Sequence, residues 1–192
     1  MAITMSRKGY GQVEPNHLSG IITGQIYAQL PAHVQTEAVG SAASITQLEQ
    51  GQFAKYDYAN NEVNFTGDGE FMLVYNEEKL YDERYQSHKD FVYKTTDFSD
   101  GKIYPRLIRT YVGDIMTTNT IAVANTSNTA TVGSTSLEVG NYLTIGSDGF
   151  LALATTSGSA STTMPSTGIV WKVVKEYTMP DGQPGVKIQR VQ

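Results

Sequence analysis

The stretch LEQGQFAKY at residues 48–56 is repeated farther along the chain as LEVGNYLTI at residues 137–145. Both copies read Leu-Glu, any residue, Gly, a residue with an amide side chain, and an aromatic residue. The residues after the glycine alternate in character, which is typical of a turn that leads into a β-strand. The stretch therefore predicts that the chain is built from β-units.

The repeat has two interpretations. Each copy is followed by turn-rich sequence and a second apolar run, EFMLVY at residues 70–75 and GFLALA at residues 149–154. Such recurrence can mark an internal duplication, but short alternating phrases also recur by coincidence in β proteins. Neither copy contains a reactive group of side chains, so the repeat indicates a scaffold and leaves the function open.

The composition favours β-structure over helix. Of the 192 residues, 17% are charged, which is below the usual quarter, and the chain is rich in tyrosine and glycine. We therefore expect an all-β fold, mainly an antiparallel sandwich or barrel, with one short helix near residues 77–90 and long polar loops.

The charge and the cysteine count exclude several classes of function. A net charge of -5 argues against nucleic acid as a partner, because a phosphate-binding protein needs a surplus of Lys and Arg on one face. The chain has no cysteine, which excludes disulfides, thiol catalysis and thiolate metal sites. The opening MAITM is too short for a signal peptide, and no apolar run approaches the roughly 20 residues of a membrane helix. We expect a soluble protein made in the cytoplasm, with no membrane partner.

Residues 1–35 are expected to form an extended N-terminal arm, and residues 36–192 a β-rich core. The N-terminal segment carries scattered Gly and Pro without a helical period, and glycine-rich flanks weaken the register of a strand. A frayed terminus that leads to an edge strand fits the same sequence. The interface residues predicted for the arm are its apolar side chains Ile21, Ile22, Ile26, Tyr27 and Leu30.

Local patterns place strands and one helix along the core. Residues 53–75 predict a three-stranded meander, with turns at Asn-Asn and Gly-Asp-Gly. Residues 77–90 predict a helix, because Asn76 can cap its N-terminus and two glutamates lie in its first turn. Residues 169–177 and 186–191 flank a turn-rich connection and predict a hairpin.

A change in composition marks the region that follows the middle of the chain. Between Arg109 and Lys172 there is no basic residue, and Thr, Ser, Ala, Gly and Asn dominate. We expect Ser/Thr-rich loops at residues 116–136 and 155–167. Their low charge argues against full disorder, so such loops can be ordered on a larger surface.

No pattern of reactive side chains indicates an enzyme. His17, His33 and His88 are far apart and lack ligand spacing, so we expect no metal site. Acidic side chains of the predicted helix share one solvated helix with basic residues, unlike a catalytic carboxylate pair; they are Glu77, Glu78, Asp82 and Glu83. We predict no catalytic residue, no cofactor and no enzymatic activity.

Aromatic residues allow three uses. The chain has 12 tyrosines and one tryptophan, Trp171. A flat ring with a polar tip can stack on a sugar, fill a protein interface or pack within a sheet. Sheet packing accounts for most of the tyrosines, and the β-branched neighbours of Trp171 favour a place in the core.

Three stretches resemble the small β-rich decoration, or cement, proteins that attach to the outer capsid of tailed bacteriophages. They are LEQGQFAKYD at residues 48–57, GEFMLVYNEE at residues 69–78, and VGDIMTTN at residues 112–119, which leads to VGNYLTI at residues 139–145. The resemblance implies a structural virion protein that binds the outer capsid surface and stabilises the shell. The implied partners are the major capsid protein and copies of the chain itself, with a trimer as one arrangement.

Two other functions fit the same residues. A phage tail or baseplate adaptor protein would need the same composition. A carbohydrate-binding β module would use the tyrosines and Trp171 as platforms for sugar rings.

Overall fold

The computed structural model is almost entirely β in the part of the chain that it describes. Strands make up 42%, the sheets are antiparallel, and a short 3-10 helix lies at Thr95–Asp97. The predicted all-β antiparallel fold is thus confirmed. The described residues are 2–14, 17, 26–28, 31–32, 45–75, 81–82, 87–88, 92–97, 99–122, 124–126, 129–131, 137–156 and 159–192.

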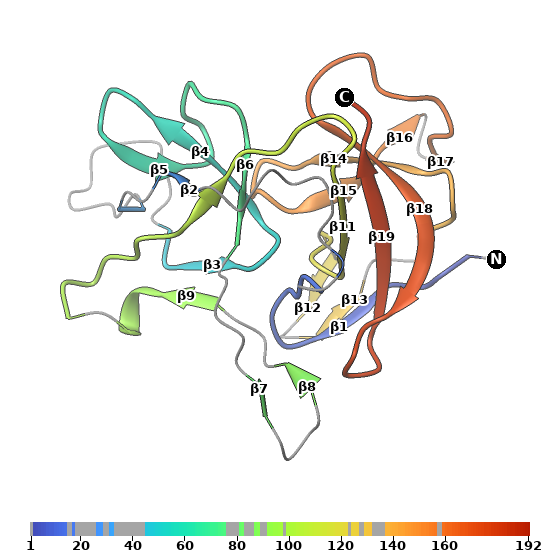
Figure 1. Cartoon of the computed structure of the whole chain (residues 1–192), viewed down its shortest axis with the longest axis horizontal. Helices are drawn as coiled ribbons and strands as arrows, with labels where there is room; N and C mark the ends of the chain where they lie inside the picture. Colours follow the sequence, from blue (N-terminus) through green and yellow to red (C-terminus); the bar gives the residue numbers. More distant parts are fainter. Residues whose placement is uncertain are drawn as a thin grey trace.

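Two five-stranded units form the body of the molecule, with unit 1 on the left and unit 2 on the right of Figure 1. Unit 1 consists of β2 (Ile26–Ala28), β4 (Phe53–Asp57), β5 (Glu62–Asn64), β6 (Met72–Val74) and β10 (Leu107–Ile108). Unit 2 consists of β11 (Ile115–Thr118), β14 (Tyr142–Ile145), β15 (Leu151–Leu153), β18 (Val170–Thr178) and β19 (Pro184–Arg190).

The two units share one topology. The strand order is β2-β10-β6-β4-β5 in unit 1 and β11-β19-β18-β14-β15 in unit 2. In both, the first strand of the unit lies beside the fifth, the fifth beside the fourth, the fourth beside the second, and the second beside the third. A parallel bridge joins the segment after the first strand to the third strand, Ala32 with Val63 and Ile121 with Leu151. Each sheet thus closes on itself, which protects its edges.

The repeated sequence builds the same turn in both units. In unit 1 the side-chain oxygen of Gln52 accepts a hydrogen bond from the N–H of Glu49 at 2.9 Å. In unit 2 the side-chain oxygen of Asn141 accepts one from the N–H of Glu138 at 2.8 Å. The shared amide residue of the sequence therefore has a shared task, because it stabilises the turn that starts the second strand of each unit.

The glycine of each copy lies at the centre of that turn. Gly51 and Gly140 have φ angles of 86° and 98°, a region that glycine adopts without steric strain. The N–H of Gly51 donates to the carbonyl oxygen of Val74 at 2.9 Å, and that of Gly140 donates to Val173 at 2.8 Å. The two copies thus mark a repeated structural unit rather than a coincidence.

Alternate residues of unit 1 serve two cores. One face of its sheet points inward and joins the core of the unit itself, with Ala54, Val63, Met72, Val74 and Leu107. The opposite face joins the core of unit 2, with Phe53, Leu73, Tyr75 and Ile108. The ring centres of Phe53 and Trp171 are 6.0 Å apart at this contact. Unit 1 is therefore buried on both faces of its sheet, which is typical of an internal layer.

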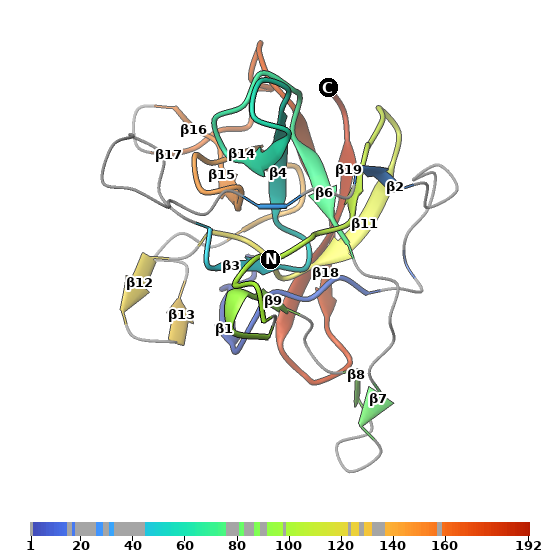
Figure 2. The same ribbon diagram turned by 90° about the vertical axis from the view of Figure 1, so that its left-hand side faces the viewer.

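Short strands surround the two units. A three-stranded sheet contains β1 (Ser6–Lys8), β12 (Ala124–Thr126) and β13 (Thr129–Thr131). Three two-stranded pairs are β3 (Gln47–Glu49) with β9 (Val92–Lys94), β7 (Tyr81–Asp82) with β8 (Ser87–His88), and β16 (Thr155–Thr156) with β17 (Ser159–Ala160). Figure 2 shows that β12–β13 and β7–β8 project on opposite sides of the body.

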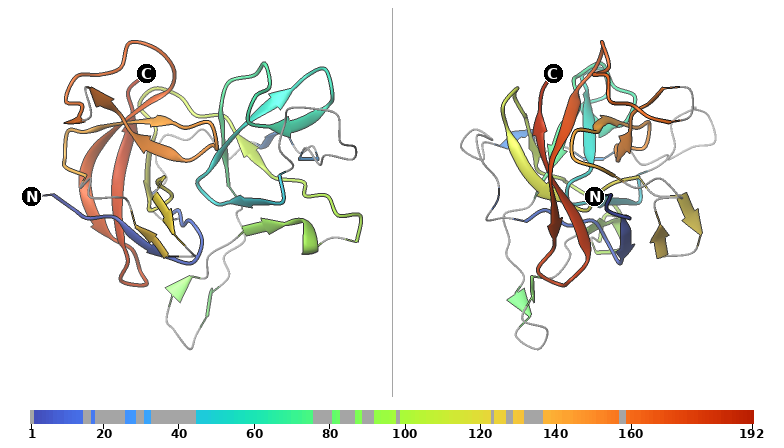
Figure 3. Two further views of the ribbon diagram at one scale, coloured as in Figure 1. Left: turned by 180° about the vertical axis from the view of Figure 1, so that it is seen from behind. Right: turned by 90° about the vertical axis from the view of Figure 1, so that its right-hand side faces the viewer.

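The first residues of the predicted arm belong to the body of the molecule (Figure 3). Met5 and Val13 are buried in the core of unit 2. Ile3 pairs with Leu137 in an isolated antiparallel bridge, at the position where β9 pairs with Leu48 in unit 1. The N-terminal segment thus takes in unit 2 the place that β9 takes in unit 1. The rest of the arm, apart from residues 17, 26–28 and 31–32, lies outside the described residues.

The predicted helix at residues 77–90 is wrong. Of these residues the structure describes Tyr81–Asp82 and Ser87–His88, which are two short strands paired with each other. A helix of this length is marginal in water unless an apolar face packs on a core, and tyrosine also favours strands. The other residues of the segment lie outside the described residues.

Other local predictions had mixed outcomes. The C-terminal hairpin is confirmed by β18 and β19. Residues 53–75 hold three strands, but β4 lies between β5 and β6, so they do not form a meander. The loops predicted at residues 116–136 and 155–167 contain most of β11 and all of β12, β13, β16 and β17, because threonine, which dominates them, is β-branched and favours strands.

Candidate functional site

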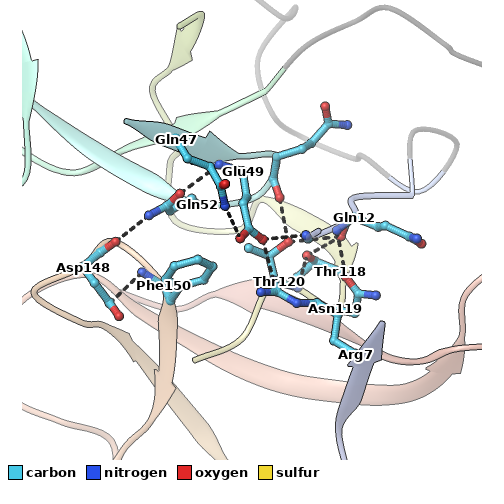
Figure 4. A network of polar contacts seen from close by, with 12 residues as sticks. Arg7, Gln12, Gln47, Glu49, Gln52, Thr118, Asn119, Thr120, Asp148 and Phe150 are labelled. Carbon is cyan, nitrogen blue, oxygen red and sulfur yellow. Dashed lines mark hydrogen bonds and ion pairs between the residues drawn. The ribbon is translucent and has the colours of Figure 1, made fainter. Parts of the chain in front are cut away.

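A buried polar network lies where the N-terminal segment meets both units (Figure 4). At its centre, Nη1 of Arg7 lies 2.8 Å from Oε2 of Glu49, and both side chains are less than a tenth exposed. The same carboxylate accepts hydrogen bonds from the N–H of Gly11 at 2.6 Å and from Nε2 of Gln47 at 3.2 Å. Arg7 also lies over the ring of Phe150, 5.4 Å from its centre. A buried carboxylate is tolerated where charge and donors compensate it in this way.

Two side chains of the network cross from one unit to the other. Nε2 of Gln52 donates to the carbonyl oxygen of Asp148 at 2.6 Å. The hydroxyl of Thr120 donates to the carbonyl oxygen of Gln50 at 2.6 Å. These bonds fix the repeated turn of unit 1 against the β14–β15 hairpin and the end of β11 in unit 2.

The N-terminal segment is bound to β11 by a second set of bonds. The N–H of Gln12 donates to Oδ1 of Asn119 at 2.7 Å, and the hydroxyl of Thr118 donates to the carbonyl oxygen of Gln12 at 2.6 Å. The N–H of Glu14 donates to the carbonyl oxygen of Thr117 at 2.8 Å. Residues 12–14 therefore follow the end of β11 and are part of the junction.

The network has the properties of a structural junction. A general base or nucleophile must reach a substrate, whereas the carboxylate of Glu49 is buried against Arg7 and Gly11. Within the described ranges, no group of three or more His, Cys, Asp or Glu could hold a metal ion. The geometry supports one role for these residues, which is to hold two units and the N-terminal segment in one arrangement.

The outer faces of the two units carry different side chains at equivalent positions. In unit 1 the row across β4, β6 and β10 is buried and apolar, with Phe53, Leu73 and Ile108. In unit 2 the equivalent row across β14, β18 and β19 is half-buried and polar, with Tyr142, Lys172 and Gln189. Unit 1 uses this face to contact unit 2, while unit 2 turns it to the outside.

A group of lysines, here called the lysine face, covers the outside of unit 2. It consists of Lys172, Lys175 and Lys187. Lys175 is directly opposite Lys187 across β18 and β19, and Nζ of Lys172 lies 5.8 Å from the centre of the Tyr142 ring. None of the three lysines forms an ion pair with a residue in the described ranges. The face is therefore a positive surface on an acidic chain.

The β4–β5 hairpin of unit 1, at residues 57–62 and here called the acidic hairpin, carries the opposite charge. Asp57 is directly opposite Glu62. Hydrogen bonds from the side chain and then the backbone of Asn60 lower the pKa of Asp57, against a smaller effect of desolvation. Tyr58 is 55% exposed, and its ring centre is 4.5 Å from that of Tyr56. The hairpin thus presents negative charge and an aromatic ring to solvent.

The interface residues predicted from the sequence are only partly described. Ile26 and Tyr27 belong to β2, whose backbone pairs with β10 inside unit 1. Ile21, Ile22 and Leu30 lie outside the described residues. The interface predicted for this segment stays a prediction.

The aromatic and histidine side chains are dispersed. Trp171 is fully buried, as expected for a core residue. Tyr104 and Tyr111 are 37% and 45% exposed on separate loops. His17 makes an edge contact with the ring of Tyr177 at 4.9 Å. These residues do not converge on a shared site within the described ranges.

Comparison with known proteins does not identify a relative. The chain matches no protein-family model, no curated protein and no solved structure. Among the residues that the structure describes, no helix is long and apolar enough to span a membrane.

Proposed function

We propose that this chain is a structural virion protein that binds the outer capsid surface of a tailed bacteriophage and stabilises the shell. The resemblance of residues 48–57, 69–78 and 112–119 to capsid decoration proteins supports the proposal. The partner is the major capsid protein. Binding of this kind needs complementary surfaces and no reactive side chain.

The observation that carries the proposal is the use of buried charge in the junction. Arg7 and Glu49 form a buried ion pair between the N-terminal segment and unit 1, and the carboxylate of Glu49 also accepts a hydrogen bond from the N–H of Gly11. Gln52 binds across to unit 2. A protein that reinforces a shell must keep its shape while neighbouring subunits pull on it. A junction crossed by an ion pair and side-chain hydrogen bonds serves that need, because buried polar bonds favour one arrangement.

Co-sedimentation with purified empty shells tests the proposal. We expect saturable binding of the full chain and a higher melting temperature of decorated shells. Absence of binding to shells, or binding confined to tails in labelled particles, would contradict capsid decoration; the second result would support a tail or baseplate adaptor.

A test of capsid attachment through the predicted N-terminal arm needs a variant that leaves the core of the molecule intact. Deleting residues 1–35 would remove Met5 and Val13 from the core, so loss of binding would be uninformative. The double variant Ile21→Asp/Ile22→Asp leaves residues 2–14 in place and should abolish shell binding, while Tyr111→Ser on an exposed loop should not. Normal decoration by the double variant would disprove attachment through this segment.

A carbohydrate-binding module is the second candidate, and one observation favours it. The rings of Tyr56 and Tyr58, which flank Asp57 in the sequence, lie 4.5 Å apart, and paired aromatic rings suit a sugar. Trp171 cannot contribute, because it is fully buried. Glycan-array binding that is lost in Tyr58→Ala would favour this function over capsid decoration.

A further inference from the structure

Two cross-strand pairs of like charge lie on the surface of this molecule. Asp57 is opposite Glu62 across β4 and β5, and Lys175 is opposite Lys187 across β18 and β19. Directly opposed like charges destabilise an antiparallel sheet. One pair is acidic and the other is basic, so each could relieve the repulsion in the other.

The two pairs cannot meet within one chain. The acidic hairpin joins β4 and β5 of unit 1, and the basic pair belongs to β18 and β19 of unit 2; these two pairs of strands lie on opposite sides of the molecule in Figure 1. The negative charge of the acidic pair is stabilised within the chain, because the carboxylate of Asp57 accepts hydrogen bonds from Asn60 and Asn64. Lys175 and Lys187 have no ion pair with a described residue. A second molecule can supply a counter-charge to this pair.

The contact between the units indicates how a second copy could supply it. Inside the chain, the outer face of unit 1 touches the β14–β15 hairpin, where the N–H of Phe53 donates to the carbonyl oxygen of Gly149 at 2.8 Å. The residue of unit 1 that is equivalent to Gly149 is Asn61, in the turn between β4 and β5. Both residues have a positive φ, 79° at Gly149 and 51° at Asn61. In this contact, the hairpin of one unit lies on the outer face of the other unit. The same contact between two molecules brings the acidic hairpin of one copy to the outer face of unit 2 in the next copy. That face carries Lys172 at the position equivalent to Leu73.

We propose that copies of this chain associate head to tail, with the acidic hairpin of one copy on the lysine face of the next. The contact is heterologous, so it leads to a ring if the rotation closes and to an open chain if it does not. Within one chain, apolar side chains join unit 1 to unit 2. The proposed contact between two chains has the same arrangement, but ion pairs replace the apolar side chains. The exposed ring of Tyr58 adds a surface on which a lysine can lie.

Sedimentation velocity of the purified chain tests this without any shell. At low salt we expect association that grows with concentration, and at high salt a dissociation constant at least about tenfold weaker, because salt screens the charges. Two variants reverse one surface each. The first is Lys175→Glu/Lys187→Glu on the lysine face, and the second is Glu62→Lys in the acidic hairpin combined with Asp68→Lys, an exposed residue of the adjacent turn, whose glycines Gly67 and Gly69 lie against Tyr56. Each alone should weaken association at least about tenfold, since like charges then face each other. Lys102→Glu, at an exposed lysine elsewhere, is the matched control and should associate as the unmodified chain does.

An equimolar mixture of the two reversed variants is the decisive sample. In the mixture, each reversed surface finds an opposite charge on the other variant, so association should return. Thermal melting of each variant checks that it is folded. A chain that stays monomeric at all concentrations in low salt, or variants that associate normally, would overturn the proposal. If the lysine variant loses shell binding although no form self-associates, the lysine face binds an acidic shell surface and the head-to-tail contact is wrong.

Discussion

Unit 1 and unit 2 have the same strand order but differ in what covers their outer faces. Leu73 of unit 1 is fully buried against unit 2, whereas its counterpart Lys172 is partly exposed. Strand β6 is buried at each of its positions, while β18 contains buried, half-buried and exposed positions. One closed sheet can thus serve as an internal layer or as an outer surface. The choice lies in every second residue, because successive side chains point to opposite faces.

Exchanging the residues at this equivalent position should give the largest effect. Leu73→Lys places a charge among apolar side chains and should lower the free energy of unfolding by more than about 4 kcal/mol, through lost packing and desolvation. Lys172→Leu should change it by less than about 1 kcal/mol, because the side chain is partly exposed. Urea denaturation measures both. Equal losses in the two variants would show that the outer faces do not differ as described.

The carboxylates of the two repeated turns should differ next. Glu49→Gln removes the charge that faces Arg7 and should cost about 3 kcal/mol or more, because an arginine remains buried without its counter-ion. The equivalent Glu138 is exposed, so Glu138→Gln should change stability by less than about 0.5 kcal/mol. Chemical denaturation of both variants checks the comparison, and a small loss in Glu49→Gln would mean that the ion pair does not hold the junction.

The glycines of the repeated turns separate backbone strain from crowding. An added methyl group at Gly51 would lie 2.6 Å from the hydroxyl of Thr120 and 2.8 Å from Val13, whereas one at Gly140 would meet nothing within 4 Å. Both have positive φ, so alanine costs about 1 kcal/mol at Gly140 and about 3 kcal/mol at Gly51. Thermal unfolding measures the difference. Indistinguishable melting temperatures would contradict the close contact between units.

The amide side chains of the turns should give the smallest effect. Asn141→Ala removes one turn bond and should cost about 1 kcal/mol. Gln52→Ala also removes the bond to Asp148 in the other unit and should cost about 2 kcal/mol. Denaturant titration of the two single variants would find equal losses only if the bond across the junction contributes nothing.

Part of this architecture could be predicted because it depends on neighbouring residues. The repeated Gly and amide residue specify the turn locally, and the strands β4 and β14 follow directly. The hairpin of β18 and β19 likewise depends on alternation around a turn. The prediction of a helix at residues 77–90 was wrong because it gave more weight to local capping signals than to the β-preference of these residues.

The rest of the fold depends on contacts between distant residues. Arg7 and Glu49 carry no local sign of their pairing, and the Thr-rich strands that follow Arg109 pair only through distant partners. The lysine face could have been found in part, because WKV at residues 171–173 and VKI at residues 186–188 alternate apolar and charged residues, which indicates one face turned to solvent. The partner of that face could not be found, since it requires knowing which strand lies beside β18.

Lysine footprinting by mass spectrometry tests the central difference between the units most directly. The chain is treated with an acylating reagent when dilute and when concentrated at low salt, and labelling of Lys175 and Lys187 is compared with that of Lys102. We expect the two lysines of unit 2 to be labelled in the dilute sample and protected in the concentrated one, with Lys102 labelled equally in both. Equal labelling of Lys175 and Lys187 at both concentrations would contradict the view that the outer face of unit 2 is a contact surface between molecules.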